Sequence, residues 1–111
     1  MNYKKRVVIT GLGLISPLGN NLDDFWTNIK LGKIGIKNIN HFDTTNYEVK
    51  IAGTVENFCI NDFITKKIVK KFDHFIQYGL AAGIQAVCDA GINNNKKIKK
   101  EHVGVIIGSG I

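Results

Sequence analysis

Runs of Val and Ile that end in glycine lie near both ends of the chain. Arg6–Thr10 (RVVIT) ends at Gly11, and Val103–Ile107 is followed by the glycine turn Gly108-Ser109-Gly110. A continuous β-branched run bounded by glycine is typical of a buried parallel strand. The pattern therefore predicts a strand near each end, and the second strand leads into a turn that would shape a site.

The segment after Gly19 has the pattern of a helix. Asn20 or Asn21 can cap it, and two aspartates in its first turn suit the positive end of the helix dipole. Gly32 ends it. Its apolar side consists of Phe25, Trp26, Ile29 and Leu31. From Lys33 to Asn61 the sequence is irregular, with one extended piece at Val49–Val55, and we interpret this region as an excursion from the sheet.

A long apolar helix is predicted from His74 to Ala90, with Asp73 as its cap and Gly91 at its end. Apolar side chains recur every three to four residues, so we expect the helix to be deeply packed. Small side chains would let a neighbouring element approach closely: Gly79, Ala82, Gly83 and Ala86. The lysine-rich segment Asn93–Lys100 is typical of a solvated loop.

The length of 111 residues and the hydrophobic share of 44% fall within the usual range for one domain. No apolar stretch approaches the ~20 residues of a membrane span, and no signal peptide precedes the first strand, so we expect a cytoplasmic protein without a membrane partner. The net charge of +6 comes from lysine, and Arg6 is the only arginine. Such a skew resembles AT-rich codon usage and weakens the case for a nucleic-acid partner, because arginine is the usual base-reading residue.

The sequence Gly11-Leu12-Gly13 after a strand raises the possibility of a dinucleotide site. The third glycine of that motif is replaced by Ser16, Pro17 follows at once, and no acidic residue closes a second strand at ribose-binding distance. A tight turn is therefore the favoured interpretation.

Neither the cysteines nor the histidines form a recognisable catalytic or metal-binding set. Cys59 and Cys88 are far apart, lack metal-ligand spacing, and are expected to fill the core as reduced thiols. Their alternative role as nucleophiles is less favoured, since no histidine lies within two turns of Cys88. His74 beside Asp73 could be an oriented base, but adjacent helix positions do not face each other. We predict no catalytic residue, no metal ligand and no cofactor.

A cluster of four lysines, Lys66, Lys67, Lys70 and Lys71, lies on a short predicted helix, Lys66 to Phe72, capped by Thr65. From the residues alone, a solvated helix face is the favoured interpretation. The alternative is a docking patch for an acidic partner, attracted over long range and weakened by salt.

Four separate blocks resemble the N-terminal segment of bacterial β-ketoacyl-[acyl-carrier-protein] synthase II. They are RVVITGLGLISPLGN from Arg6, HFDT from His41, FIQYG from Phe75, and IGSGI from Ile107, in the family's order. The resemblance implies a partial thiolase-like α/β fold at residues 1–111: an incomplete N-terminal half with about two core strands, an excursion and a buried helix. It also implies a homodimer for a complete enzyme, and we doubt that the chain folds stably alone.

The family elongates fatty acyl chains by decarboxylative condensation of malonyl-acyl carrier protein, using a cysteine and two histidines. In the family these residues follow the Gly-Ser-Gly-Ile loop, so no residue here matches them, and Cys88, His74 and His102 do not take these roles. The resemblance therefore implies a truncated N-terminal β-ketoacyl synthase domain that is inactive by itself.

Two features carry over from the family. Lys67, Lys70 and Lys71 match a basic helix that contacts the acidic acyl carrier protein, which reverses the preference for a solvated face. Ile111 matches an isoleucine of the acyl pocket. The alternative function is a non-catalytic module that binds acyl carrier protein or a synthase subunit, and a third is a dinucleotide-binding domain.

Overall fold

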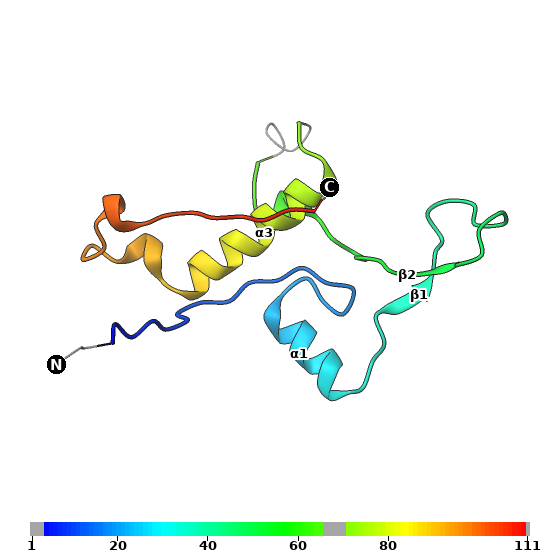
Figure 1. Cartoon of the computed structure of the whole chain (residues 1–111), viewed down its shortest axis with the longest axis horizontal. Helices are drawn as coiled ribbons and strands as arrows, with labels where there is room; N and C mark the ends of the chain where they lie inside the picture. Colours follow the sequence, from blue (N-terminus) through cyan, green and yellow to red (C-terminus); the bar gives the residue numbers. More distant parts are fainter. Residues whose placement is uncertain (1–3, 66–70, 111) are drawn as a thin grey trace.

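The computed structural model describes residues 4–65 and 71–110. Helix α3 lies at its centre, with the N-terminal chain on one side and the last extended segment alongside (Figure 1). The elements are α1 (Leu22–Lys30), β1 (Ile36–Asn38), β2 (Ile51–Gly53), α3 (His74–Asp89), and three single-turn 3-10 helices, η1 (Ile60–Asp62), η2 (Ile92–Asn94) and η3 (Lys100–His102).

Helix α1 confirms the predicted cap and end. The side-chain Oδ1 of Asn21 accepts a hydrogen bond of 2.9 Å from the backbone N–H of Asp24, which satisfies one free donor of the first turn. The chain leaves the helix through Gly32 at φ 66°, a left-handed conformation that glycine adopts without steric cost.

Helix α3 confirms the bounds of the second predicted helix, since it begins at His74 and its C-cap is Ala90. Asp73 stands at the N-cap position, but its side chain makes no capping hydrogen bond. Gly91 then reverses the chain at φ 65°. The expectation of deep packing is wrong for this chain, because Ala81 is the only buried residue of α3 and Phe75 is exposed. The described elements cover only part of the helix surface, so most of its apolar side chains are half-buried.

One side of α3 is covered by the glycine loop, residues 11–20. A Cβ atom on Gly13 would lie 2.6 Å from the backbone nitrogen of Ala86, so a side chain there would collide with the helix backbone. Two hydrogen bonds hold the same contact. Gln85 Nε2 donates to the Asn20 carbonyl at 2.9 Å, and the Leu12 N–H donates to Asp89 Oδ2 at 2.8 Å.

A small apolar cluster forms where η1 meets the first turns of α3. Ile60 is 5% exposed, and Phe58 packs edge-on against Tyr78 with ring centroids 4.9 Å apart. Phe63 stacks on the other side of Phe58 at 6.3 Å. With Ala81, Ile60 completes the buried hydrophobic set of the described chain.

The sheet is a two-stranded antiparallel ladder in the excursion, with Ile36 opposite Gly53 and Asn38 opposite Ile51. Strand β2 confirms the extended piece expected at Val49–Val55. Strand β1 lies in a region that the sequence presents as irregular, and its three residues are too few for an alternating pattern to stand out.

The two predicted core strands are not hydrogen-bonded strands in this chain. Residues 6–10 and 103–107 run as extended backbone, and neither joins the described sheet (Figure 1). Their side chains are exposed, Ile9 by 82% and Ile106 by 100%. A strand needs a partner for its backbone groups, and no other described segment supplies one here. Residues 4–65 and 71–110 therefore form a partial α/β piece whose only strand ladder lies in the excursion.

Most of the predicted basic helix, with Lys66, Lys67 and Lys70, lies outside the described residues. Its last two residues, Lys71 and Phe72, form a turn and a bend before α3 begins. The helix therefore does not reach Phe72.

The chain is extended for its length. Its radius of gyration is 17.9 Å and its dimensions are 62 × 38 × 26 Å. A compact domain of this size has a radius of gyration of about 13 Å. The difference fits the exposed terminal segments and the projecting excursion, so this chain encloses only a small core.

The glycine loop yields a matched pair of substitutions. We expect Gly13→Ala to destabilise the contact between loop and helix by about 1–3 kcal/mol, because the added methyl group meets backbone that cannot move aside. Gly79→Ala should instead raise the helix content, since its Cβ meets nothing within 4 Å and alanine is favoured in a helix by about 1 kcal/mol. Amide hydrogen exchange across α3 measures both effects. Equal protection in the two variants would contradict the close approach.

Candidate functional site

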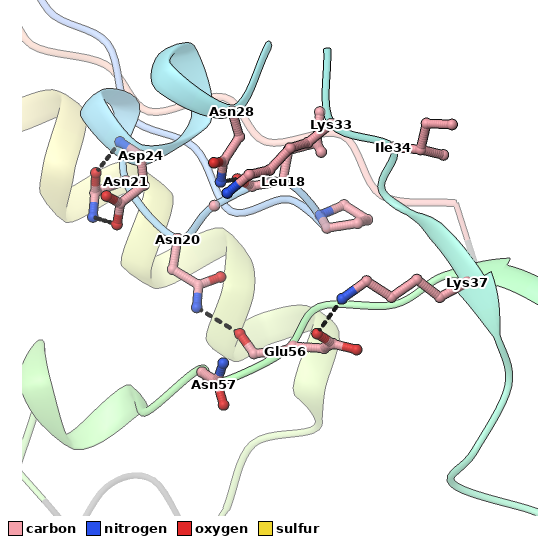
Figure 2. Close-up of a pocket in the computed structure, with 12 residues that line it drawn as sticks. Leu18, Asn20, Asn21, Asp24, Asn28, Lys33, Ile34, Lys37, Glu56 and Asn57 are labelled. Carbon is pink, nitrogen blue, oxygen red and sulfur yellow. Dashed lines mark hydrogen bonds and ion pairs between the residues drawn. The ribbon is translucent and has the colours of Figure 1, made fainter. Parts of the chain in front are cut away.

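A polar cavity of about 490 Å³ lies between the glycine loop, helix α1 and the chain that follows β2. Figure 2 shows its lining of 12 residues, among them four asparagines and four charged side chains. The ion pair between Lys37 Nζ and Glu56 Oε2, at 2.6 Å, borders it. Both side chains are about half exposed, so this pair adds little to stability.

Asn20 is the central residue of this cavity. Its Nδ2 donates to the Glu56 carbonyl at 2.8 Å, and its own carbonyl accepts from Gln85. Asn20 of the glycine loop thus contacts the excursion through its side chain (Figure 2) and α3 through its backbone carbonyl. Its Oδ1 is buried and has no hydrogen-bond partner within residues 4–65 and 71–110, so this acceptor is left unsatisfied there.

Two further features shape the cavity. Asn28 Nδ2 of α1 donates to the Leu18 carbonyl at 2.6 Å. Asn57 adopts φ 55°, a left-handed conformation in which asparagine is the best tolerated residue after glycine. The lining offers amides, two lysines and two carboxylates, and no cysteine or histidine. Its chemistry suits hydrogen bonding and offers no nucleophile paired with a base.

Both cysteines are exposed, which corrects the expectation that they fill the core. Cys59 lies directly before η1, and Cys88 lies in the last turn of α3, where it lines a shallow cavity together with Leu12 and Leu22. The apolar neighbours of the two cysteines in the sequence predicted buried thiols, but burial requires covering elements that the described chain does not contain.

Among the described residues no histidine is hydrogen-bonded to a thiol, although His74 and Cys59 line the same cavity of about 340 Å³. His41 packs edge-on against Phe42, with ring centroids at 4.9 Å, and His74 tilts toward Tyr78 at 6.1 Å. No ion pair joins His74 to Asp73 in the described part of the chain. The described residues also contain no group of three His, Cys, Asp or Glu that could hold a metal ion.

The close packing of the glycine loop accounts for Gly11 and Gly13 without a nucleotide. The space that a pyrophosphate would need is occupied by the backbone of α3 near Ala86 and Ala90. The glycines serve helix packing, which supports the tight-turn interpretation of the sequence.

The residues assigned by resemblance are described only in part. Lys67, Lys70 and Ile111 lie outside the described residues. Lys71 is exposed in the turn directly before α3. Its position at the surface is compatible with docking of an acidic partner, and the docking role stays a prediction.

The HFDT block forms a small turn at the tip of the excursion. Asp43 Oδ1 accepts hydrogen bonds from Thr45 Oγ1 at 2.6 Å and from the Thr45 N–H at 2.9 Å. These two bonds, the side-chain one foremost, lower the pKa of the Asp43 carboxyl below its ordinary value, because they stabilise the charged form.

Sequence reasoning missed the polar residues that hold the site together. Gln85 and Asp89 bind the glycine loop, and Asn20 joins three segments. A signal was present, since Gln85 is a polar residue inside an otherwise apolar stretch of helix. Its burial predicts a partner, although the sequence does not say which backbone group accepts the bond.

Comparison with solved structures places this arrangement among the ketosynthases. The structure titled "The ishigamide ketosynthase/chain length factor" superposes on 87% of this chain with a TM-score of 0.69 and 28% sequence identity. The match covers 23% of that protein.

Sequence comparison agrees with the structural match. The family model described as "Beta-ketoacyl synthase, N-terminal domain" matches residues 4–111. The chain belongs to this family. The 3-oxoacyl-[acyl-carrier-protein] synthase 2 of Vibrio cholerae serotype O1 is 48% identical over 108 residues, 97% of this chain. The protein of the same name from Staphylococcus aureus strain COL is 44% identical over all 111 residues.

The chain spans about a quarter of the length of these curated relatives, 26% of the Vibrio cholerae protein and 27% of the Staphylococcus aureus protein. Among the described residues, no helix is both long and apolar enough to cross a membrane.

The turn at Asp43 yields a prediction on pH. Thr45→Val should raise the pKa of Asp43 toward its ordinary value, because it removes the hydroxyl bond, whereas Thr45→Ser should retain the lowered pKa. Since the folded pKa is lowered, the turn gains stability above the ordinary pKa of an aspartate and loses it as pH falls through the folded value. A carbon-13 NMR titration of the Asp43 carboxyl tests this. An unchanged pKa in Thr45→Val would show that the hydroxyl bond does not form.

Proposed function

We propose that this chain forms the N-terminal part of a 3-oxoacyl-[acyl-carrier-protein] synthase, which elongates a fatty acyl chain by decarboxylative condensation with malonyl-acyl carrier protein. The observation that carries the proposal is the family match over residues 4–111, with relatives of that name at 44–48% identity. The complete synthase would work as a homodimer in the cytoplasm.

Within such a synthase, this part would supply a scaffold instead of the reacting groups. By resemblance, the nucleophilic cysteine and the two histidines follow the Gly-Ser-Gly-Ile loop. Cys59 and Cys88 are both exposed, and no hydrogen bond in the described chain joins either thiol to a histidine that could act as its base. What this chain contributes is the packing of the glycine loop on α3, from which the chain extends toward the loop at residues 108–111.

A second role proposed for the same part is docking of the acidic acyl carrier protein by Lys67, Lys70 and Lys71, with Ile111 contributing to the acyl pocket. The exposure of Lys71 beside the first turn of α3 supports the docking role. Lysine is a point charge on a flexible stem, so contacts of this kind steer association and respond to salt. If the docking survives without the rest of a synthase, the chain could act as the non-catalytic binding module considered above.

The central test of the proposed function is a covalent chimera. In it, this chain replaces the matched 108 residues of the Vibrio cholerae synthase. We expect ketoacyl product from the chimera with acyl- and malonyl-acyl carrier protein, and none above the buffer blank from the isolated chain, because acyl transfer needs a nucleophile supplied from elsewhere. Cys88→Ala in the chimera is the matched control and should leave turnover unchanged. An inactive but well-folded chimera would contradict the proposal, and loss of turnover in Cys88→Ala would reassign the nucleophile.

Docking is tested by charge reversal. The triple variant Lys67→Glu, Lys70→Glu, Lys71→Glu should weaken binding of labelled acyl carrier protein about tenfold, at roughly 0.5 kcal/mol for each exposed pair. Raising the salt from 0.1 M to 1 M should also weaken binding, since the Debye length falls from about 10 Å to about 3 Å.

A matched control separates local docking from net charge. Lys96→Glu, Lys97→Glu, Lys99→Glu makes the same change of charge in the exposed segment after η2 and should leave binding nearly intact. If both triple variants bind equally, the lysines of the proposed patch are only a solvated face.

A further inference from the structure

The two extended segments beside α3 are incomplete as strands. Residues 6–10 and 103–107 combine β-branched side chains with exposed surfaces, and the exposure of Val7 and Val8, or of Ile106 and Ile107, shows that both faces of each segment are open. Neighbouring side chains on a strand point to opposite faces, so a strand covered on one face would alternate between exposed and buried.

The backbone of these segments is also available for pairing. Within the described chain, the only backbone hydrogen bond of residues 103–110 runs from the Val103 N–H to the Lys100 carbonyl. Residues 4–11 make none with the rest of the described chain. Each segment thus presents a row of free N–H and C=O groups, which is a template for strand addition.

The geometry is already arranged for such an addition. Both segments run along α3 in the same direction, opposite to the helix, as neighbouring parallel strands with a crossover helix do (Figure 1). An apolar groove of about 360 Å³ separates α3 from the last segment and is lined by Gly83, Val87, Val105 and Ile107, among others. The 87% overlap with a solved ketosynthase shows that most of this chain already has the arrangement found in a complete protein.

The positive charges close to both segments argue against strand pairing with a second copy of this chain. Lys4, Lys5 and Arg6 flank the first segment, and Lys99 and Lys100 precede the second. Pairing two copies would bring like charges together, and edge lysines are a common means by which proteins prevent self-association of strands. The curated relatives are about four times as long as this chain, so the rest of a synthase is large enough to supply strands.

We propose that the open edges at residues 6–10 and 103–107 form a docking surface for β-strands from the remaining part of a 3-oxoacyl-[acyl-carrier-protein] synthase, and that these strands can be supplied by a separate polypeptide. The inference rests on the proposed function. The inference adds that the two parts of a synthase join at the backbone edges next to α3. It also adds that this pairing needs no covalent connection between the two parts.

The test uses this full chain and, as a separate polypeptide, the part of the Vibrio cholerae synthase that it does not match. Co-expression followed by affinity purification and native mass spectrometry should give a one-to-one complex. Ile106→Pro should weaken it about tenfold or more, because proline removes a ladder donor and is excluded from central strands. Ile106→Thr keeps the N–H and the strand preference and should bind within about threefold of the wild type. The Ile106 N–H has no partner in the described chain, so proline there costs no existing bond.

The outcomes separate this inference from the proposed function. No complex from the two polypeptides, with an active covalent chimera, would overturn the inference and leave the proposed function standing. Equal binding by Ile106→Pro would show that the edges do not pair as strands. A homodimer of this chain that Ile106→Pro disrupts would make a second copy the occupant and would also overturn it. An inactive, folded chimera would remove the proposed function and the inference together.

Discussion

The close approach of the glycine loop to helix α3 is the contact on which the rest of this structure depends. At Gly11 and Gly13 the chain meets the helix backbone to backbone, with no room for a Cβ atom. Hydrogen bonds from Gln85 and to Asp89 fix the loop at two levels of the helix. Because the loop is held there, α1, the polar cavity around Asn20 and the excursion all take their positions relative to α3.

Other parts of the described chain have no such contact: one surface of α3 is open, and the two extended segments are unpaired. Cβ atoms at Gly79 and Gly83 would meet nothing within 4 Å, and the extended segments have no ladder partners among the described residues. Each exposed apolar side chain forgoes about 1.5–3 kcal/mol of burial energy. The family relationship provides a reason, since the relatives are about four times as long and a larger protein can cover these surfaces.

Local signals in the sequence predicted the helices well, because caps and glycine ends act within a few residues. Asn21, Gly32 and Gly91 all take the predicted roles. Predictions that depended on distant partners were less successful. The Val and Ile runs indicated strands, and the apolar pattern of α3 indicated deep burial, but both outcomes require covering elements that the described chain does not contain. Cys88 is exposed for the same reason.

At the polar site, too, the features that depend on distant partners could not be predicted. Gln85 and Asn20 make their bonds to backbone atoms 65 and 36 residues away in sequence, so no local pattern could assign their partners. The docking lysines and Ile111 were assigned by resemblance alone, and of these the structure describes Lys71, at the surface. Family membership was accessible from four sequence blocks, since their order and spacing are more specific than any single glycine motif.

Amide hydrogen exchange at Val8 and Ile106 tests the central claim most directly. In the isolated chain both amides should exchange at nearly the rate of an unstructured peptide, because neither has a hydrogen-bond partner among residues 4–65 and 71–110. In the covalent chimera with the rest of the Vibrio cholerae synthase both should become strongly protected, as in a central strand. Equal exchange in the two proteins, whether fast or slow, would contradict the account of residues 6–10 and 103–107 as strand edges that the rest of a synthase completes.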